Sequence, residues 1–340
     1  MSRCIELAKN GFGTTYPNPM VGSVIVYEGK IIGEGWHKKA GEPHAEVNAV
    51  NSVQDKSILR KATIYVSLEP CSHFGKTPPC SDLIIKHKIP NVVIGTVDPF
   101  AKVAGNGIKK LIEAGIHVTV GILEDECNEL NKRFFTFHQK KRPYIILKWA
   151  QSQDGFIAPL EKSEKKPVWI SNTYSRQLTH KWRTEEQAIL VGTQTVIDDN
   201  PKLNARDWQG NNPIRIVLDA KNRIPKESAI FDNSIKTIVF NNSENAVSLE
   251  NTTFVSIDFK QNIAEQIAES LYNHNIQSVI IEGGLQTLQT FIDANLWDEA
   301  RIFTGKITFE KGINAPLISK TNSKKYSIEK DELTILRNHD

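Results

Sequence analysis

The segment Ser67-Leu68-Glu69-Pro70-Cys71, followed by Cys80 after eight intervening residues, decides how the first half of the chain is interpreted. The apolar run Thr63–Leu68 predicts a strand, and a helix is expected to begin near Cys80. Upstream, His44-Ala45-Glu46 follows a proline at the expected start of another helix. We expect the histidine and both cysteines to lie at helix starts, where the helix dipole favours a thiolate over a thiol.

One imidazole and two thiolates form a three-ligand set for tetrahedral Zn²⁺ and leave the fourth position open for water. Zinc lowers the pKa of that water to about 7, so hydroxide forms at neutral pH. Glu46 follows His44 by two residues and can carry the proton of that water to a leaving amine. His-x-Glu followed by Pro-Cys is the signature of zinc-dependent base deaminases, although that signature ends in Cys-x-x-Cys. We expect the longer loop here, residues 72–79, to form part of a substrate pocket.

Two other interpretations of the cysteines stay open at this point. A structural zinc site would need a fourth ligand, for which Cys4, His73 and Cys127 are the candidates. Alternatively, free cysteines in a reducing compartment are commonly packing residues.

The composition is that of a globular protein and excludes disorder, collagen-like sequence and coiled coil as descriptions of the whole chain. Of the 340 residues, 39% are hydrophobic and 24% are charged. At about 150 residues per domain, this length predicts two domains. The 42 basic and 39 acidic residues give a formal charge of +3 without a long block of one sign. The charge therefore gives little support to a nucleic-acid partner, which usually needs a clustered basic face.

The hydrophobic pattern also predicts where the protein resides. No apolar run reaches the roughly 18 residues of a membrane span. Residues 1–13 carry charges where a signal peptide would need an apolar core. We therefore expect no membrane association and a cytoplasmic location, where disulfides are rare.

Strands and helices are expected to alternate after an initial hairpin, which predicts an α/β sandwich with one mixed sheet in the first half. A single helix over 124–139 is expected to close this unit, and the charged stretch 139–143 marks the boundary. We therefore expect domains over residues 1–142 and 143–340. The second begins with the strand 144–150 and continues the α/β pattern with helices over 174–184, 263–273 and 285–294 and strands over 188–191, 214–218, 237–240 and 278–281.

Taken alone, the second half shows weaker chemical signals. Lys148 lies at a strand end, and Gly192-Thr193-Gln194-Thr195 offers backbone amides to a phosphate at a helix start. Glu282-Gly283-Gly284-Leu285 follows a strand and lets a cofactor approach the backbone closely. The pattern is not GxGxxG, so a Rossmann dinucleotide site is not indicated.

Several motifs together strongly resemble the bifunctional riboflavin-biosynthesis deaminase–reductase family. They are Tyr16-Pro17-Asn18-Pro19-Met20-Val21-Gly22, Gly33-Glu34-Gly35-Trp36-His37, His44-Ala45-Glu46-Val47 and the stretch from Ser67 to Cys80. The resemblance implies a cytidine-deaminase-like α/β/α sandwich with a mixed sheet, followed by a dihydrofolate-reductase-like α/β domain. It also implies two reactions on a small phosphorylated pyrimidine. The first deaminates 2,5-diamino-6-ribosylamino-4(3H)-pyrimidinone 5′-phosphate, and the second reduces its ribosyl group to ribityl with NADPH.

For the first domain, the resemblance implies that His44, Cys71 and Cys80 bind Zn²⁺ and that Glu46 transfers the proton. It implies substrate contacts for Asn18, Lys76 and Thr77.

For the second domain, the resemblance implies a larger set of residues. Substrate contacts are expected from Arg183, Leu203, Arg206 and Glu282, the two arginines being natural phosphate partners. Lys148 and Asp199 are expected to assist catalysis by stabilising or protonating the opened sugar. The NADPH site is expected to comprise Ala150, Trp169, Thr195, Asp199, Gly284, Leu285, Gln286, Thr287, Leu288, Gln289 and Thr290.

A homo-oligomer, either a dimer or a tetramer, is the quaternary structure that the resemblance suggests. The sequence is also compatible with two alternative functions. One is a zinc deaminase of nucleosides or RNA bases with a non-catalytic C-terminal binding domain, and the other is a zinc-stabilised scaffold without catalysis.

Overall fold

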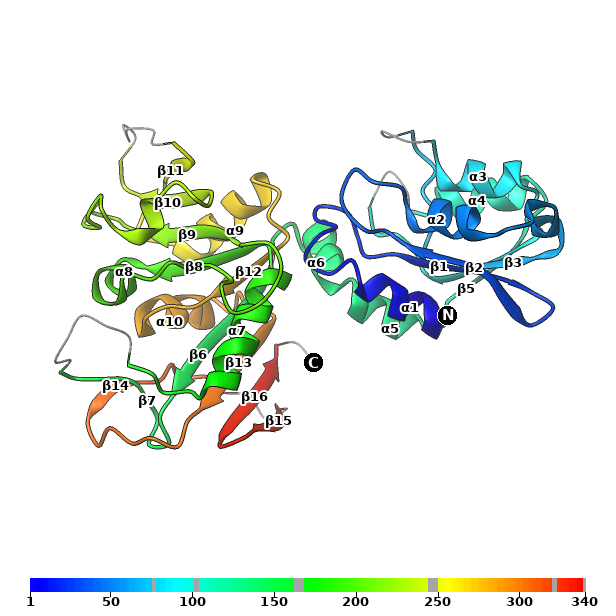
Figure 1. Ribbon diagram of the computed structural model, residues 1–340. Coiled ribbons are helices and arrows are strands. Elements are labelled where there is room, and N and C mark those ends of the chain that lie inside the picture. Colours follow the sequence, from blue (N-terminus) through cyan, green and yellow to red (C-terminus); the bar gives the residue numbers. More distant parts are fainter. Residues whose placement is uncertain (75–77, 101–103, 162–167, 244–249, 320–322, 339–340) are drawn as a thin grey trace. The chain divides into compact units, whose positions relative to one another are not determined.

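The computed structural model describes residues 1–74, 78–100, 104–161, 168–243, 250–319 and 323–338. The chain divides into two compact units, Met1–Lys141 and Arg142–Asp340 (Figure 1). None of the described helices is both long and apolar enough to cross a membrane.

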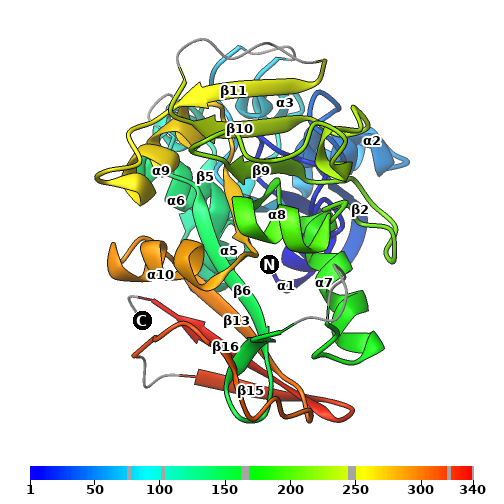
Figure 2. The same cartoon turned by 90° about the vertical axis from the view of Figure 1, so that its left-hand side faces the viewer.

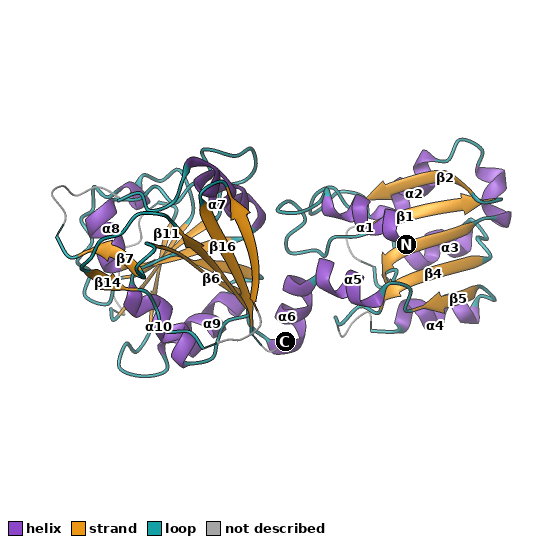
Figure 3. Cartoon of the chain, turned by 90° about the horizontal axis from the view of Figure 1, so that it is seen from below, coloured by secondary structure: helices purple, strands orange, loops and turns teal. Residues whose placement is uncertain are grey.

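Unit 1 is built on a mixed five-stranded sheet among its described residues, in the order β2-β1-β3-β4-β5 (Figure 3). β1 pairs antiparallel with β2 and β3, whereas β3, β4 and β5 are parallel. The strands are β1 (Gly22–Tyr27), β2 (Lys30–Trp36), β3 (Thr63–Leu68), β4 (Asn91–Thr96) and β5 (His117–Val120). The helices are α1 (Ser2–Lys9), α2 (Ala45–Ser52), α3 (Cys80–Lys86), α4 (Asn106–Glu113), α5 (Glu124–Leu130) and α6 (Lys132–Lys140).

Helices cover both faces of this sheet, with α2, α3 and α4 on one face and α1 and α5 on the other (Figure 1). The alternation of side chains along β3 explains the division. Ile64 and Val66 enter the core beneath α2, α3 and α4, whereas Tyr65 packs against Cys4 and its neighbours on the α1 side. The α/β/α sandwich expected for the first half is therefore present.

The single helix expected over 124–139 is wrong, because the chain forms two helices that meet at Asn131. The side chain of Asn131 accepts a hydrogen bond from the backbone amide of Met20 at 2.8 Å and donates one to its carbonyl at 2.8 Å. These two buried hydrogen bonds fix the position of the Asn131 side chain, and the helix is interrupted at this residue. Side chains of this kind compete with the backbone for hydrogen bonds.

Unit 2 is built on a nine-stranded sheet among its described residues, in the order β11-β10-β9-β8-β12-β6-β13-β16-β15 (Figure 2). A separate pair is formed by β7 (Phe156–Pro159) and β14 (Gly312–Asn314). The large sheet contains β6 (Tyr144–Gln151), β8 (Ala188–Gly192), β9 (Ile214–Leu218), β10 (Thr237–Asn241), β11 (Thr252–Ser256), β12 (Ser278–Ile281), β13 (Glu299–Thr304), β15 (Ser323–Ile328) and β16 (Asp331–Arg337). The helices are α7 (Thr173–Glu185), α8 (Thr193–Asp199), α9 (Ile263–Asn273) and α10 (Leu285–Asp293).

Side chains of β6 alternate between two hydrophobic cores, one on each face of the sheet. Ile145, Leu147 and Trp149 pack with residues of α9 and α10, whereas Tyr144 and Ile146 pack with Trp182 of α7 on the opposite face. The strand is therefore buried on both faces, as expected of parallel strands covered by helices. Of the residues expected at the second site, Glu282 and Gly284 follow the end of such a strand, β12, whereas Lys148 lies within β6 and Arg183 lies on α7.

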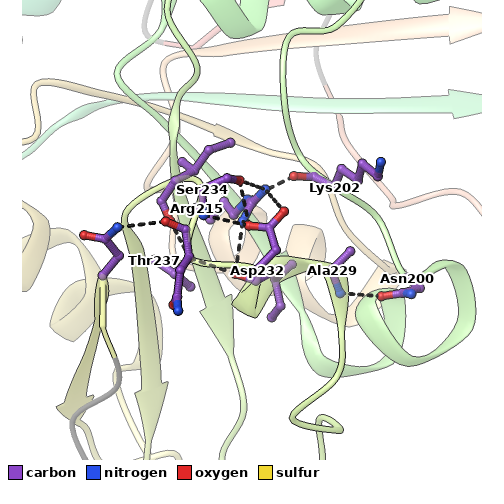
Figure 4. A network of polar contacts seen from close by, with 11 residues as sticks. Asn200, Lys202, Arg215, Ala229, Asp232, Ser234 and Thr237 are labelled. Atoms are coloured by element: carbon purple, nitrogen blue, oxygen red, sulfur yellow. Dashed lines mark hydrogen bonds and ion pairs between the residues drawn. The ribbon is translucent and has the colours of Figure 1, made fainter.

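Arg215 of β9 organises the turn that follows α8 (Figure 4). Its guanidinium is 1% exposed; it donates to the Lys202 carbonyl at 2.9 Å and to the Asp232 carboxylate at 2.7 Å. Asn200 accepts a hydrogen bond from the Ala229 amide at 2.8 Å. Both contacts hold residues 200–203, which line the main cavity of this unit.

We predict that Arg215→Met lowers the free energy of unfolding of unit 2 by about 3 kcal/mol. Removing one partner of a buried pair costs about 3–5 kcal/mol, and the lower value applies because the Asp232 side chain is partly exposed. Urea unfolding followed by tryptophan fluorescence measures the change, since five of the six tryptophans lie in unit 2. The exposed Arg223→Met is the control and should be near-neutral. Equal stability of both variants would contradict this structural role.

Candidate active sites

Three side chains predicted to bind zinc converge in unit 1. His44 is the N-cap of α2, Cys80 is the first residue of α3, and Cys71 follows β3 in the connecting loop. The expectation that Cys71 lies at a helix start is therefore wrong. The loop instead returns so that the Cys80 amide donates to Cys71 Sγ at 3.3 Å and the Ser81 amide to the Cys71 carbonyl at 3.1 Å.

The donor atoms have the spacing that a tetrahedral zinc ion requires. His44 Nδ1 lies 3.6 Å from Cys71 Sγ and 3.4 Å from Cys80 Sγ. Zn–S bonds of about 2.3 Å and Zn–N bonds of about 2.0–2.1 Å place two tetrahedral corners about 3.6 Å apart. All three atoms lie within 4.8 Å of one another. The donor set and its spacing thus fit Zn²⁺ with one coordination position left for a non-protein ligand.

The four cysteines have two different environments. Hydrogen bonds from the Cys80 thiol, from His44 and from the Cys80 amide lower the pKa of Cys71 to about 4. Burial raises the pKa of Cys4 to about 12 and of Cys127 to about 11, and both pack in the core on the α1 side. Among the described residues, the His and Cys cluster contains only His44, Cys71 and Cys80, which disfavours the four-ligand structural site.

Glu46 lies beside this cluster in the first turn of α2. Its side chain is buried, and burial raises its pKa to about 7. The carboxyl group interacts with the Cys80 thiol but does not belong to the three-donor cluster. A buried carboxyl next to an open metal position has the placement that a proton-transfer group needs.

Asn18 contacts His37, a residue beside the metal cluster that ends the motif Gly33–His37 but was not predicted to have a role of its own. Its amide Nδ2 lies 3.1 Å from His37 Nε2, and His37 Nδ1 lies 3.2 Å from the Pro43 carbonyl. Because an amide nitrogen only donates, Nε2 accepts and Nδ1 carries the hydrogen. The His37 ring contacts that of His44 edge-on at 5.3 Å between centroids. The motif that ends at His37 is the sequence signal that could have indicated a role for this histidine. Lys76 and Thr77 lie outside the described residues.

A cavity of about 930 Å³ in unit 2 collects most residues expected there. The predicted residues that line it are Lys148, Ala150, Trp169, Arg183, Thr195, Asp199, Leu203, Arg206, Glu282, Gly284 and Leu285. Its walls combine an exposed tryptophan, small residues at strand ends and several charges. Such a cavity is large enough for a dinucleotide and a small substrate.

A compact charge cluster lies at this cavity. Glu282 Oε2 is 2.8 Å from Arg183 Nη2 and 3.7 Å from Lys148 Nζ. Burial opposes ionisation of Glu282, but the charges of Arg183 and Lys148 lower its pKa to about 2. Burial also lowers the pKa of Lys148, although Glu282 opposes this shift. The cluster presents a partly desolvated ammonium group inside the cavity.

The segment from Gly284 to Thr290 divides between the cavity and the core. The Gly284 amide donates to Thr195 Oγ1 at 3.1 Å, which joins α8 to the start of α10. A Cβ at Gly192 would lie 2.6 Å from Thr287 Oγ1, so the two helix starts pack closely. Leu288 is fully buried in the core. Gln286, Gln289 and Thr290 are not among the residues that line the cavity.

His180 is a second cavity residue that the sequence interpretation missed. It precedes Arg183 by one helical turn, and this spacing on α7 could have indicated it. Its ring is buried, with Nε2 3.1 Å from Asp207 Oδ2. Burial, followed by the charges of Arg183 and Arg206, lowers the pKa of His180 to about 4. The lowered pKa favours the neutral ring, whose Nε2 lies next to Asp207 in the loop that carries Arg206.

Family models match both halves of the chain. Residues 1–96 match the cytidine and deoxycytidylate deaminase zinc-binding region, and residues 143–331 match the RibD C-terminal domain. The predicted fold class is therefore confirmed. Because the second half matches a reductase domain, a deaminase with a non-catalytic appendage is not favoured, and neither is a scaffold without catalysis. Zn²⁺ and NADPH are the cofactors that fit these two domains.

Curated relatives extend the match to nearly the whole chain. The riboflavin biosynthesis protein RibD of Aquifex aeolicus is 41% identical over 92% of this chain and 88% of its own length. That of Bacillus amyloliquefaciens is 38% identical over 94% of this chain and 87% of its own.

Solved structures give the same result. A diaminohydroxyphosphoribosylaminopyrimidine deaminase/5-amino-6-(5-phosphoribosylamino)uracil reductase from Thermotoga maritima has a TM-score of 0.89 at 38% identity, covering 99% of this chain and 97% of its own. RibD of Acinetobacter baumannii has a TM-score of 0.88 at 32% identity, covering 100% of this chain and 98% of its own. The chain therefore belongs to the RibD family of bifunctional deaminase–reductase enzymes of riboflavin biosynthesis.

Proposed function

We propose that the two reactions are divided between the units, with deamination in residues 1–142 and reduction in residues 143–340. The observation that carries this proposal is the three-donor cluster of unit 1, whose spacing fits one zinc ion beside a buried carboxyl group. The separate charged cavity of unit 2 supports the second assignment. The proposed substrates are the diaminopyrimidine ribosyl phosphate and its deaminated product.

In unit 1, His44, Cys71 and Cys80 would hold the zinc ion. When bound, zinc supplies a water molecule whose pKa is lowered toward about 7. Glu46 accepts a proton on its buried carboxyl group and delivers it to the departing amine, which leaves as ammonia. Asn18, fixed by His37, would orient the substrate, and we propose the same role for Lys76 and Thr77.

In unit 2, the small substrate binds against the charge cluster. NADPH supplies the hydride. Lys148 is proposed to donate a proton to the oxygen of the opening sugar ring, with Asp199 assisting, because its ammonium group lies in the cavity and is partly desolvated. Glu282 and Leu203 would contact the substrate. Arg183 and Arg206 would bind its phosphate group through hydrogen bonds and ion pairs.

The proposed NADPH site follows the ends of β6, β8 and β12 in the same cavity. Ala150, Trp169, Thr195, Asp199, Gly284 and Leu285 line it and are the candidates for direct contact. Residues 286–290 are proposed to act mainly through the backbone and packing of α10, as the buried Leu288 illustrates.

We also propose a cytoplasmic location and a homo-oligomer, either a dimer or a tetramer. Four free cysteines support a reducing compartment. The balanced charge supports a small phosphorylated substrate rather than nucleic acid.

We predict that Glu46→Gln lowers the deaminase kcat by about 10²–10⁴-fold, the usual contribution of a proton-transfer group. The amide keeps the volume of the carboxyl group but cannot accept and return the proton. Ammonia release measures the loss, while zinc content and the NADPH-dependent reaction should be unchanged. The matched control is Glu42→Gln, an exposed glutamate two residues before His44. Full deaminase activity in metal-replete Glu46→Gln would remove the proposed role.

Removing the metal should separate the two activities. We expect dialysis against a zinc chelator to abolish ammonia release from the diaminopyrimidine substrate, because the proposed site holds the only metal that this reaction uses. NADPH oxidation should continue when the deaminated intermediate is supplied directly. Restoring Zn²⁺ should restore ammonia release. Deamination by metal-free protein would rule out the proposed mechanism.

Lys148→Met should lower the reductase kcat by about 10²-fold or more while leaving the deaminase unchanged. Methionine retains most of the side-chain volume but has no proton to donate. Stopped-flow measurement of NADPH oxidation, with the deaminated intermediate as substrate, reports the step. Lys181→Met on the exposed face of α7 is the control. An unaltered reductase rate would exclude Lys148 as the donor.

A further inference from the structure

Glu69, which the mechanism does not use, has an unusual environment next to the metal cluster. It follows β3 and precedes Cys71 by two residues, and its side chain is buried. Oε2 accepts hydrogen bonds from the amides of Asp98 at 3.3 Å and Gly105 at 2.9 Å. Oε1 accepts from the amides of Gly107 at 2.9 Å and Ile108 at 3.3 Å. Four backbone groups from another part of the chain therefore converge on one carboxylate.

These contacts fix the start of α4 against the segment that carries Cys71. A Cβ at Gly107 would lie 2.0 Å from the Pro70 carbonyl oxygen, so the helix backbone packs directly on this residue. The amides at a helix start lack partners within the helix, and Glu69 supplies acceptors for two of them. The backbone on either side of Cys71 therefore has little freedom to move.

The same helix also contacts the element that carries Cys80. Lys110 of α4 forms an ion pair with Asp82 of α3 at 2.5 Å, and Asp82 lies two residues after Cys80. Both side chains are about one-third exposed, so this pair is the weaker of the two connections. Through α4, Glu69 connects the Cys71 segment with the helix that begins at Cys80.

We propose that Glu69 is a positioning residue for the zinc site. By holding α4 against Pro70, it keeps Cys71 Sγ and Cys80 Sγ at the spacing around His44 Nδ1 that one metal ion requires. It does not touch the metal or the substrate. This inference rests on the zinc ligands proposed above, and it adds a role to a residue outside that set.

The test replaces Glu69 by glutamine in the full-length protein. The isosteric amide places an N–H₂ donor opposite one of the two pairs of backbone N–H groups, so those hydrogen bonds are lost. Glu113→Gln is the matched control, because Glu113 lies at the end of α4, the helix whose start Glu69 contacts, but is exposed and pairs weakly with Lys109 at 3.9 Å. Glu69→Asp keeps the charge on a shorter side chain and provides a conservative variant.

Two measurements report on the metal site independently of activity. Competition with a chromogenic chelator should show zinc affinity reduced about 10–100-fold in Glu69→Gln, the usual effect of losing an outer partner of a metal site. The visible absorption of the Co²⁺-substituted protein should change, since it reports ligand geometry. Glu69→Asp should recover part of both properties, and Glu113→Gln should match the wild type. Reductase activity serves as an internal control and should be unchanged throughout.

Wild-type zinc affinity and an unaltered cobalt spectrum in Glu69→Gln would overturn the proposal. If Glu69→Gln fails to fold, the same two measurements are made on Glu69→Asp. Wild-type zinc affinity and an unaltered cobalt spectrum in Glu69→Asp would then overturn the proposal. Cys71→Ala separates this failure from failure of the zinc site itself. If the wild type and Cys71→Ala bind Co²⁺ with the same spectrum, the proposed ligand set is wrong, whatever Glu69 does.

Discussion

The convergence of two sulfur atoms on one imidazole nitrogen is the constraint on which unit 1 depends. Two thiolates close together repel each other, so the fold must compensate before any metal binds. Here Cys71 accepts hydrogen bonds, whereas the pKa of Cys80 is raised, first by its hydrogen bond to Cys71 and then by burial. The hydrogen bonds that Cys71 accepts therefore favour its thiolate form. Zinc can bind with little rearrangement, because the spacing of the three donors already fits one metal ion.

In unit 2, a buried negative charge is stabilised by two positively charged side chains. The positive charges of Arg183 and Lys148 keep the buried Glu282 ionised. The negative charge of Glu282 in turn stabilises the Lys148 ammonium group inside the cavity. Removing one partner of such a group leaves an uncompensated buried charge, so the three side chains act as one unit. The parallel pairing of β6 and β12 places Lys148 beside Glu282, which is why residues 134 positions apart in the chain meet at one site, and α7 adds Arg183.

The sequence predicts that His44, Cys71 and Cys80 converge, and the structure brings them together, because metal-binding chemistry depends on residue types at a recognisable spacing. The strands Thr63–Leu68, Ile214–Leu218 and Ser278–Ile281 were also predicted with their observed bounds, since their apolar runs end abruptly. The break at Asn131 could not be predicted, because it depends on a contact with Met20, which is 111 positions away. The strands after residue 298 were not predicted either, since β13 carries Glu299 and Arg301, whose charges are paired only in the folded sheet. His37 and His180 were not assigned roles, because the motif that ends at His37 and the helical spacing of His180 from Arg183 are weak signals. Their partners, Asn18 and Asp207, come from separate loops that meet them only in the folded chain.

The contacts of Arg183 and Arg206 separate two arginines that the sequence treats alike. Arg183 donates hydrogen bonds from Nε and Nη2 to the Glu282 carboxylate and from Nη1 to the Asn204 carbonyl oxygen. Both edges of its guanidinium group therefore already have partners. Among the described residues, Arg206 is 46% exposed and makes longer contacts, at 3.4 Å to Asn204 Oδ1 and at 3.9 Å to Asp207 Oδ2. Binding of the proposed phosphate group to Arg206 would therefore replace a weak, exposed ion pair, whereas binding to Arg183 would compete with a buried carboxylate. The two arginines thus differ in how readily each can accept a new anionic partner.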